Sequence, residues 1–164
     1  MDILFAFPAL LLTLVIIAIM GPGVDKAMIA LGLVYTPAFG RVCRGSVLAE
    51  RGKAYVEAAR MVGASDARII RKHILPNVLA PLIVNASLTM SFAVLIEASL
   101  SYLGLGAQPP MPSWGMMLGR GRAVMQYSPW LSIWPGLAIM SVVFAFNVFG
   151  DGLRDALDPR LTGK

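Results

Sequence analysis

The side chains of this sequence that could carry out catalysis are few and lie far apart along the chain. His73 is the single histidine and Cys43 the single cysteine among 164 residues. Ser99 and Ser101 offer hydroxyl groups, but no GxSG-like segment surrounds them. The sequence also holds no cluster of metal ligands and no glycine-rich phosphate-binding loop. We therefore expect no catalytic residues, no cofactor and no bound metal ion.

A binding surface is better supported than a reaction centre, and the polar stretch from Tyr55 to Asn77 is the place for it. The stretch reads YVEAARMVGASDARIIRKHILPN, and apolar runs lie on both sides of it. It holds Glu57-Ala58-Ala59, then Gly63 after three intervening residues, then Leu75-Pro76 twelve residues after the glycine. Exposed helices of this kind can dock into a groove of a partner. The alternative is a solvated loop that only connects membrane segments.

The composition of the chain indicates a membrane protein. Hydrophobic residues make up 57% of it, charged residues only 14%, and the mean hydropathy is +0.73, whereas soluble domains are about half apolar. The net charge of +5 comes from basic residues that lie beside apolar runs. That pattern is typical of membrane flanks and not of nucleic-acid binding. Met1-Asp2-Ile3-Leu4 lacks the basic start of a signal peptide.

The hydrophobic runs predict an all-α, polytopic transmembrane helix bundle. A bilayer core of about 30 Å needs about 20 helical residues. Four segments fit or nearly fit, at about 3–20, 24–41, 78–103 and 130–150. Gly21-Pro22-Gly23 would join the first two as a hairpin, because glycine and proline end a helix. Between the last two, Gly104 to Ser128 predicts a short helix on or dipping into the outer membrane surface, with Trp114, Met117, Leu118 and Met125 at helical spacing.

The basic residues predict the orientation of these segments. If both termini and the stretch at 41–75, which contains most of the loop at 42–77, are cytoplasmic, eleven of the fourteen Lys and Arg lie inside: Arg41, Arg44, Arg51, Lys53, Arg60, Arg68, Arg71, Lys72, Arg154, Arg160 and Lys164. Lys26, Arg120 and Arg122 then lie outside. An inside excess of this kind sets the topology of bacterial membrane proteins. We expect a multi-pass protein of the cell (inner or plasma) membrane.

Within the loop the sequence predicts two helices that meet at a glycine corner and form an L. Gly45 to Val62 is rich in good helix formers, with Val47, Leu48, Tyr55, Ala59 and Val62 near one face. Gly63 would end that helix in a left-handed conformation. Ser65 would cap a second helix that runs to Leu75, and Pro76 would start the next membrane segment.

Glu57-Ala58-Ala59 with Gly63 and Leu75-Pro76 resembles the EAA motif of the permease subunits of bacterial ABC importers. The general motif has isoleucine two residues before the leucine, whereas this chain has His73, as the dipeptide, oligopeptide and nickel permeases do. Met1–Leu12 resembles the third membrane helix of those permeases. Two further stretches, Glu97–Gly115 and Phe146–Arg160, resemble the subunit usually called C, and the resemblance covers essentially the whole chain.

The resemblance implies a permease of the type I ABC importer fold for peptides or nickel, without enzymatic activity of its own. Glu57, Ala58, Ala59, Gly63, Leu75 and Pro76 would couple it to the ATPase. The implied partners are a second, B-type permease subunit in a heterodimer, ATP-binding subunits, an extracytoplasmic solute-binding protein and membrane lipid; nucleic acid is not expected. Residues 1–164 would form one permease domain that lacks two further membrane helices upstream. A truncated scaffold that binds the ATPase without transporting, or an intramembrane enzyme, would be the alternatives.

Three residues of the third membrane segment are candidates for the transport pathway. Glu97 is the only carboxylate inside an apolar run, and charges placed in a membrane often line a pathway. Pro81 and Asn85 would bend the helix and add a polar side chain. Each has a plainer interpretation. Glu97 also fits the outer membrane interface, and Pro81 and Asn85 also fit helix packing.

Overall fold

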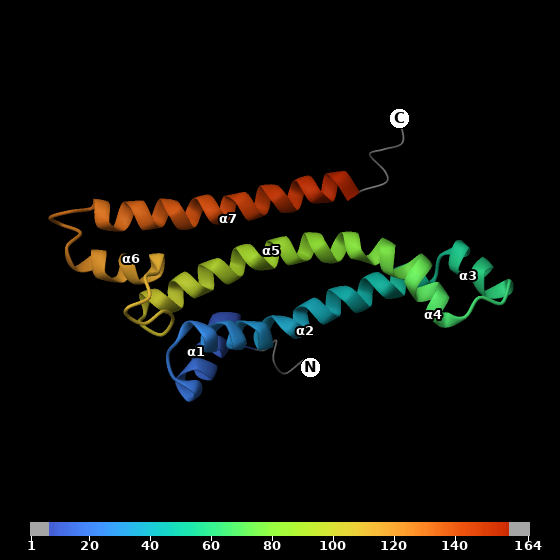
Figure 1. Cartoon of the computed structure of the whole chain (residues 1–164), viewed down its shortest axis with the longest axis horizontal. Helices are drawn as coiled ribbons and strands as arrows, with labels where there is room; N and C mark the ends of the chain where they lie inside the picture. The colour runs from blue at the N-terminus through green and yellow to red at the C-terminus, as the bar shows by residue number, and fades with distance from the viewer. Residues whose placement is uncertain (1–6, 158–164) are drawn as a thin grey trace.

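Two long antiparallel helices, α5 (Leu75–Tyr102) and α7 (Trp130–Leu157), lie side by side along the long axis of the molecule (Figure 1). This computed structural model describes residues 7–157, and every regular element in that range is helical. Small residues let the two helices approach. Ser91 Oγ lies 3.4 Å from the carbonyl oxygen of Val143, and a Cβ added to Gly150 would lie 3.0 Å from the Cβ of Ser87. Small residues at such contacts are typical of helices that associate in a membrane.

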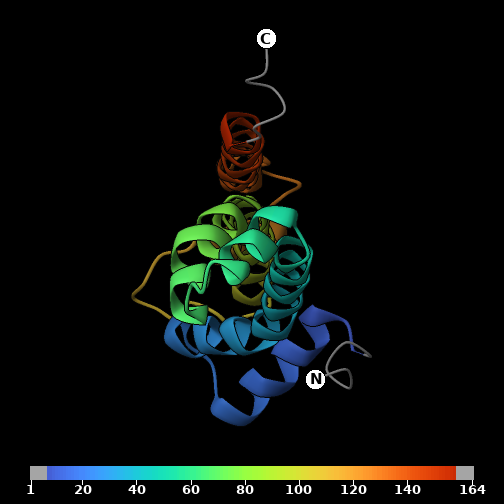
Figure 2. The same ribbon diagram turned by 90° about the vertical axis from the view of Figure 1, so that its right-hand side faces the viewer.

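On the other side of α5 lies α2 (Val24–Arg51), which contacts α1 (Ala9–Met20) near its start. Figure 2 shows the blue first half of α2 crossing the view, whereas its teal second half is seen closer to end-on. Pro37 lies inside this helix. A helix bends at such a position because proline offers no N–H and its ring crowds the carbonyl group four residues earlier.

Two of the predicted helix ranges need correction. The first, at 3–20, is a helix only over Ala9–Met20 in the described residues, and its expected first four residues lie outside them. The second, at 24–41, continues without a break to Arg51. The predicted end was placed at Arg41 because a charged residue marks where a helix leaves the membrane. A charged residue does not end a helix, so the helix can continue beyond it.

Within the part of the chain that the structure describes, two helices are suited by length and composition alone to cross a membrane: Asp66–Tyr102 and Trp130–Ala156. They correspond to the third and fourth predicted segments. α1 is a shorter apolar helix, and the charged residues of α2 keep it outside this set. The described helices therefore support two of the four predicted membrane segments. The predicted total of four membrane helices is not confirmed.

Two apolar clusters hold the helices together at opposite ends of α5. One cluster joins α1, α2 and the end of α5 through Ile17, Ala27, Ala30 and Leu100. The other, which we call the loop cluster, joins the segment at 52–74 to the start of α5 through Val56, Ile69, Ile74 and Val78. We refer to the two ends of the molecule as the α6 end and the loop end.

The helix α6 (Trp114–Ala123) packs between α5 and α7 (Figure 1). Ser113 caps it by accepting a hydrogen bond of 3.1 Å from the N–H of Met116. A Cβ added to Gly115 would lie 2.1 Å from the carbonyl oxygen of Ala98, and one added to Gly119 would lie 2.9 Å from that of Tyr102. The prediction of an outer-surface helix considered only its large side chains, and the GxxxG spacing is the signal of close packing that it missed.

We expect Gly115→Ala to destabilise the protein and Gly136→Ala to leave it unharmed. The first substitution forces a methyl group into the backbone of α5, and overpacking of this kind costs about 1–3 kcal/mol. The second adds the same methyl group to α7, where nothing lies within 4 Å. Thermal unfolding of the purified variants in detergent measures the difference. Equal unfolding midpoints for the two variants would contradict the tight α5–α6 contact.

Candidate functional site

The predicted binding loop forms a compact helical tip at the loop end (Figure 1). It consists of α3 (Ala54–Met61), α4 (Asp66–Ile69) and the π-helix η2 (Ile70–Ile74). The last two continue directly into α5, so that a single helical stretch runs from Asp66 to Tyr102. The loop is therefore one short helix, α3, attached to the end of a long one.

The prediction of one helix from Gly45 to Val62 is wrong. α2 ends at Arg51, and Lys53 is extended, with φ −81° and ψ 146°. Gly52, which lies inside the predicted helix, marks the break. As a result the predicted apolar face is divided. Val47 and Ala59 pack on the loop cluster, whereas Leu48, Tyr55 and Val62 are exposed.

Gly63 forms the corner between α3 and α4, with a left-handed φ of 78°. Its N–H bonds the carbonyl of Arg60 at 2.9 Å, and the N–H of Ala64 bonds that of Ala59 at 3.1 Å. This pair of bonds is the Schellman arrangement that ends many helices. Ala59 and Ala64 both pack on the loop cluster, so that the corner is fixed by hydrogen bonds and by apolar contact.

The second helix of the loop departs from prediction at both of its ends. Ser65 occupies the capping position, but its side chain makes no capping hydrogen bond. Pro76 does not begin a new helix, because the chain is already helical before it. Proline has no N–H to continue the α-helical pattern, and the preceding turn is a π-turn in which the N–H of Leu75 bonds the carbonyl of Ile70.

The tip of α3 carries an exposed apolar pair. Met61 is 88% exposed and Val62 is 84% exposed. They lie beside Glu57 and Ala58, which are also exposed, whereas Ala59 faces inward. Met61 had no predicted role, and Val62 was predicted to lie near one face of the helix with Val47, Leu48, Tyr55 and Ala59. The sequence signal for this exposed surface was an apolar pair directly before the corner glycine, in an otherwise charged segment.

The remaining predicted motif residues, Leu75 and Pro76, begin α5 and are exposed. They belong to the long helix and not to the corner. The motif is therefore divided between the exposed tip on α3 and the first turn of α5, and the loop cluster connects these two places.

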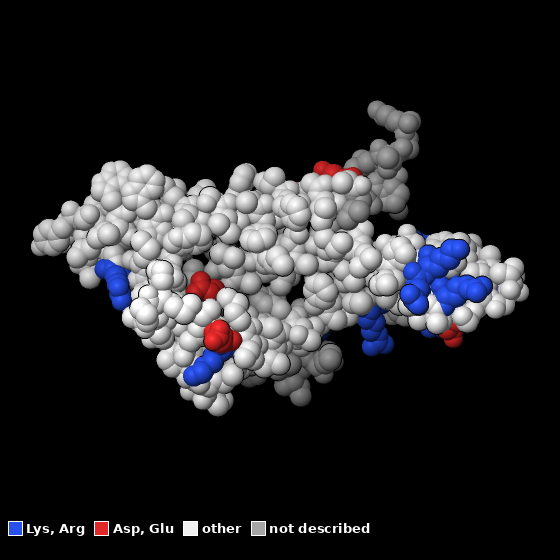
Figure 3. Space-filling model, in the orientation of Figure 1, with Lys and Arg blue, Asp and Glu red and all other residues white. Residues whose placement is uncertain are grey.

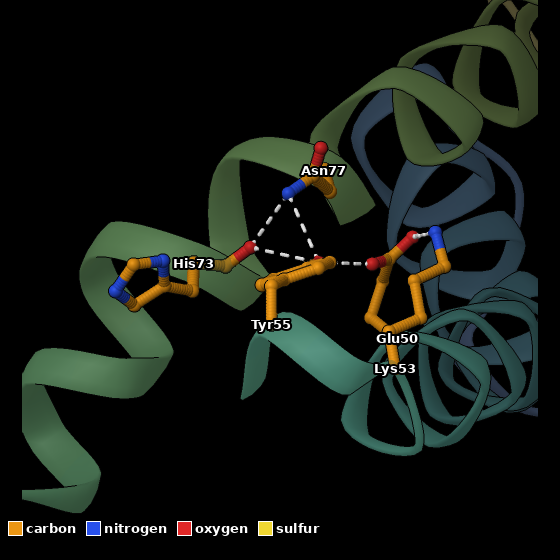
Figure 4. A network of polar contacts seen from close by, with 5 residues as sticks. All are labelled: Glu50, Lys53, Tyr55, His73 and Asn77. Carbon is orange, nitrogen blue, oxygen red and sulfur yellow. Dashed lines mark hydrogen bonds and ion pairs between the residues drawn. The ribbon is translucent and has the colours of Figure 1, made fainter. Parts of the chain in front are cut away.

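A polar network ties the base of α3 to its neighbours (Figure 4). Glu50, at the end of α2, contacts Lys53 Nζ at 2.5 Å and accepts a hydrogen bond from the Tyr55 hydroxyl. Asn77 Nδ2, in the first turn of α5, donates to the Tyr55 hydroxyl at 3.2 Å and to the carbonyl oxygen of His73 at 2.7 Å. Hydrogen bonds from Lys53 and then Tyr55 lower the pKa of Glu50, and the bond to Glu50 raises the pKa of Tyr55.

The surface charge of the molecule is concentrated at its ends. On the face drawn in Figure 3, blue side chains gather over the loop end, and the region between the ends is white over most of its length. The exposed basic residues of the loop tip are Arg60, Arg68, Arg71 and Lys72. This distribution is the one expected of a helix bundle with a membrane-embedded middle.

Glu97 lies at the α6 end, beside a pocket of about 390 Å³. The Ser101 hydroxyl donates to Glu97 Oε1 at 2.6 Å and accepts from the N–H of Ala107 at 2.9 Å. This chain of bonds orients the carboxylate. The pocket is lined by Val24, Glu97, Ala107, Met111, Pro112, Ser113, Trp114 and Met117.

The structure does not bring the three predicted pathway residues together. Asn85 and Pro81 are absent from the pocket lining, and sixteen residues of one helix separate Pro81 from Glu97, about 24 Å at the rise of an α-helix. Within residues 7–157, no group of three or more His, Cys, Asp or Glu could hold a metal ion.

The sequence matches the family described as "Binding-protein-dependent transport system inner membrane component" over residues 1–163. The chain is 50% identical over 160 residues to the "Dipeptide transport system permease protein DppC" of Alkalihalophilus pseudofirmus, which covers 98% of this chain and 53% of the relative. It is 45% identical over 162 residues to the "Glutathione transport system permease protein GsiD" of Escherichia coli, with 99% and 54% covered. The chain thus spans about half the length of the curated relatives it matches.

Among solved structures, the inward-facing MetNI methionine ABC transporter resembles this chain with a TM-score of 0.74 at 23% identity, over 96% of this chain and 72% of that one. At this identity the likeness concerns the fold alone. It confirms the predicted all-helical fold of the importer-permease type.

We expect Gly63→Ala to loosen the loop tip and Gly52→Ala to leave it intact. A side chain in the left-handed conformation of Gly63 costs about 1–2 kcal/mol, whereas Gly52 has an ordinary φ of −84°. That cost raises the open population of the tip roughly 5- to 30-fold. Limited trypsin digestion at Arg60 and Arg68 of the purified protein measures it, because cleavage follows the open population. Equal cleavage rates for the two variants would exclude a strained corner.

Proposed function

The chain belongs to the family of binding-protein-dependent transport system inner membrane components, and we propose that it is a permease subunit of an ATP-driven importer whose loop binds the ATP-hydrolysing subunit. The observation that carries this proposal is the exposed apolar pair Met61–Val62 at the tip of a rigid helix. Membership of the family gives the chain an inner-membrane location. The proposed topology has the loop end and both termini in the cytoplasm, as the basic residues favour.

The tip of α3 has the properties of a docking element. Met61 and Val62 directly precede the corner and are exposed, and burying each side chain would contribute about 1.5–3 kcal/mol. The small side chain of Ala58 lets a partner approach the helix, and Glu57 can pair with a basic group on that partner. The corner at Gly63 is fixed by hydrogen bonds before docking, so that little conformational entropy is lost on binding.

Coupling follows from the attachment of α3 to the long helix. ATP binding would draw together two ATP-binding subunits and, with them, the loops of two permease subunits. Val56 packs against Ile69 and Val78, so that a displaced α3 pushes on the start of α5. For ATP to drive the change, it must bind one global state better than the other. Hydrolysis takes place in the partner subunit, and a second permease subunit and an extracytoplasmic binding protein complete the complex.

Short peptides are the proposed substrate class. The names of two similar relatives, a dipeptide permease and a glutathione permease, support peptides over nickel. Glu97 is the proposed pathway residue at the α6 end, where Ser101 holds its carboxylate beside the pocket. Asn85 and Pro81 would meet the solute at other depths of the same helix, nearer the loop end.

The test is to purify the complete transporter with an affinity tag on this chain. We expect Glu57→Arg and Gly63→Val to abolish coupling of ATP hydrolysis to transport while membrane insertion is retained. Transport at the wild-type rate by both variants, in a complete complex, would exclude the loop as the coupling element. A wild-type chain that is purified without any ATP-binding subunit would favour another membrane function, whereas one that binds the subunit without transporting would favour the scaffold.

A second substitution tests the apolar pair directly. Met61→Asp replaces an exposed side chain, and we expect it to weaken binding of the ATP-binding subunit at least tenfold, because a carboxylate would have to lose its water in the interface. Met125→Asp is the matched control, since Met125 is 55% exposed at the α6 end. Titration of the ATP-binding subunit onto the permease in detergent measures both affinities. The same affinity for Met61→Asp and Met125→Asp would place the interface elsewhere.

A further inference from the structure

The Tyr55 hydroxyl lies where three elements meet (Figure 4). Glu50 belongs to α2, Tyr55 to α3 and Asn77 to α5. We infer that Tyr55 is a positioning residue that fastens the coupling helix α3 to both long helices, so that a movement of α3 becomes a movement of α2 and α5. This inference rests on the proposed function and adds to it the contact that transmits the force.

The hydroxyl proton of Tyr55 and both amide protons of Asn77 have hydrogen-bond acceptors in this junction. A tyrosine hydroxyl offers one proton and can also accept; here it donates to Glu50 and accepts from Asn77. The side-chain amide of Asn77 has two protons, one for the hydroxyl and one for the carbonyl oxygen of His73. Each of these three protons therefore has an acceptor, and rotating the Tyr55 side chain would break its bonds to both Glu50 and Asn77.

Asn77 lies in the first turn of α5, directly after the π-turn at 70–74, and faces the junction. The turn at 70–74 is wider than an α-helical turn, and the carbonyl oxygen of His73 accepts the Asn77 side chain at 2.7 Å while lying 3.5 Å from the Tyr55 hydroxyl. The sequence places Tyr55 and Asn77 twenty-two residues apart, so that no local pattern reveals the pair. The fold brings them together.

Hydrogen bonding keeps the junction in one protonation state near neutral pH. Lys53 and Tyr55 hold the pKa of Glu50 below its ordinary value, and Glu50 holds the pKa of Tyr55 above its own. The carboxylate is thus ionised and accepts, and the phenol is neutral and donates. A hydrogen bond to an ionised acceptor is about twice as strong as one between neutral groups.

The polar network gives α3 directional contacts, which the neighbouring apolar cluster does not provide. Val56, the next residue, is fully buried in the loop cluster, and this burial keeps α3 attached. Apolar contact is non-directional, so that it constrains the orientation of α3 on the cluster less sharply than hydrogen bonds do. The hydrogen bonds of Tyr55 are directional and add that constraint. Removing the hydroxyl should leave α3 attached to the loop cluster and able to bind the ATP-binding subunit. Movements of α3 would then be transmitted less well to α2 and α5.

The experiment uses the complete transporter in proteoliposomes, with labelled alanyl-alanine as the transported probe. For Tyr55→Phe we expect co-purification of the ATP-binding subunit at the wild-type level, ATP hydrolysis within twofold of wild type, and at least fivefold less dipeptide transported for each ATP hydrolysed. Tyr127→Phe is the matched control, because it removes the same atom from a side chain that is 90% exposed, and it should change none of the three.

A second set of variants distinguishes a role of Tyr55 in transmitting movement from a role in folding alone. Glu50→Ala should reproduce the loss in the ratio of transport to hydrolysis, and Glu50→Gln, which keeps an acceptor oxygen, should be milder. In the double variant Glu50→Ala with Tyr55→Phe, the loss should not exceed that of the worse single variant, because the residues act through one junction. Additive losses would mean independent local contacts and would overturn the inference.

The remaining outcomes are also decisive. An unchanged ratio of transport to hydrolysis in Tyr55→Phe overturns the inference and leaves the docking proposal standing. Parallel losses of co-purification and transport would make Tyr55 a residue of folding or assembly, which overturns it as well. Wild-type protein that neither binds an ATP-binding subunit nor moves peptide contradicts the proposed function itself, and that result is visible before any variant is compared.

Discussion

The burial of Val56 against the start of the long helix is the contact on which the rest of the loop depends. Val56, Ile69, Ile74 and Val78 come from both arms of the loop and from α5, and each is nearly or wholly buried. Because this cluster fixes the inner face of α3, its other face must point outward. The exposure of Glu57, Ala58, Met61 and Val62 follows from that constraint, as does the position of Tyr55 beside α2 and α5. A helix of only eight residues would not hold its shape alone, and the cluster and the Schellman corner supply what its length does not.

The long helix α5 joins two sites of different character. At the loop end it begins with a π-turn, a proline and a polar junction; at the α6 end it carries Glu97, held by Ser101 beside a pocket. Its middle contacts α7 through small residues at which backbones come close. The helix is continuous between these two ends and so connects them. The arrangement suits a subunit in which a soluble partner acts at one end and a solute is handled at the other.

Local signals in the sequence predicted the corner and the long apolar helices. Gly63 was found because a glycine after a helical pattern is itself the signal for a left-handed end. The break at Gly52 was missed because a lone glycine is tolerated in a helix, and the contact of Val56 with residues far along the chain decides the outcome there. The α6 packing was missed for a similar reason: Gly115 and Gly119 carry no side chain for an amphipathic pattern to register. The pairing of Tyr55 with Asn77 depends entirely on tertiary structure. The membrane segments were the hardest to delimit, since α2 is helical far beyond any hydrophobic stretch.

The central claim, that the exposed tip of α3 is the docking surface for an ATP-binding subunit, is tested most directly by hydrogen–deuterium exchange on the purified permease complex with and without that subunit. Docking predicts slower exchange for the amides at 54–65 when the subunit is present, together with little change at 114–123, at the other end of the molecule. Slower exchange elsewhere, with the amides at 54–65 exchanging equally fast in both samples, would contradict it.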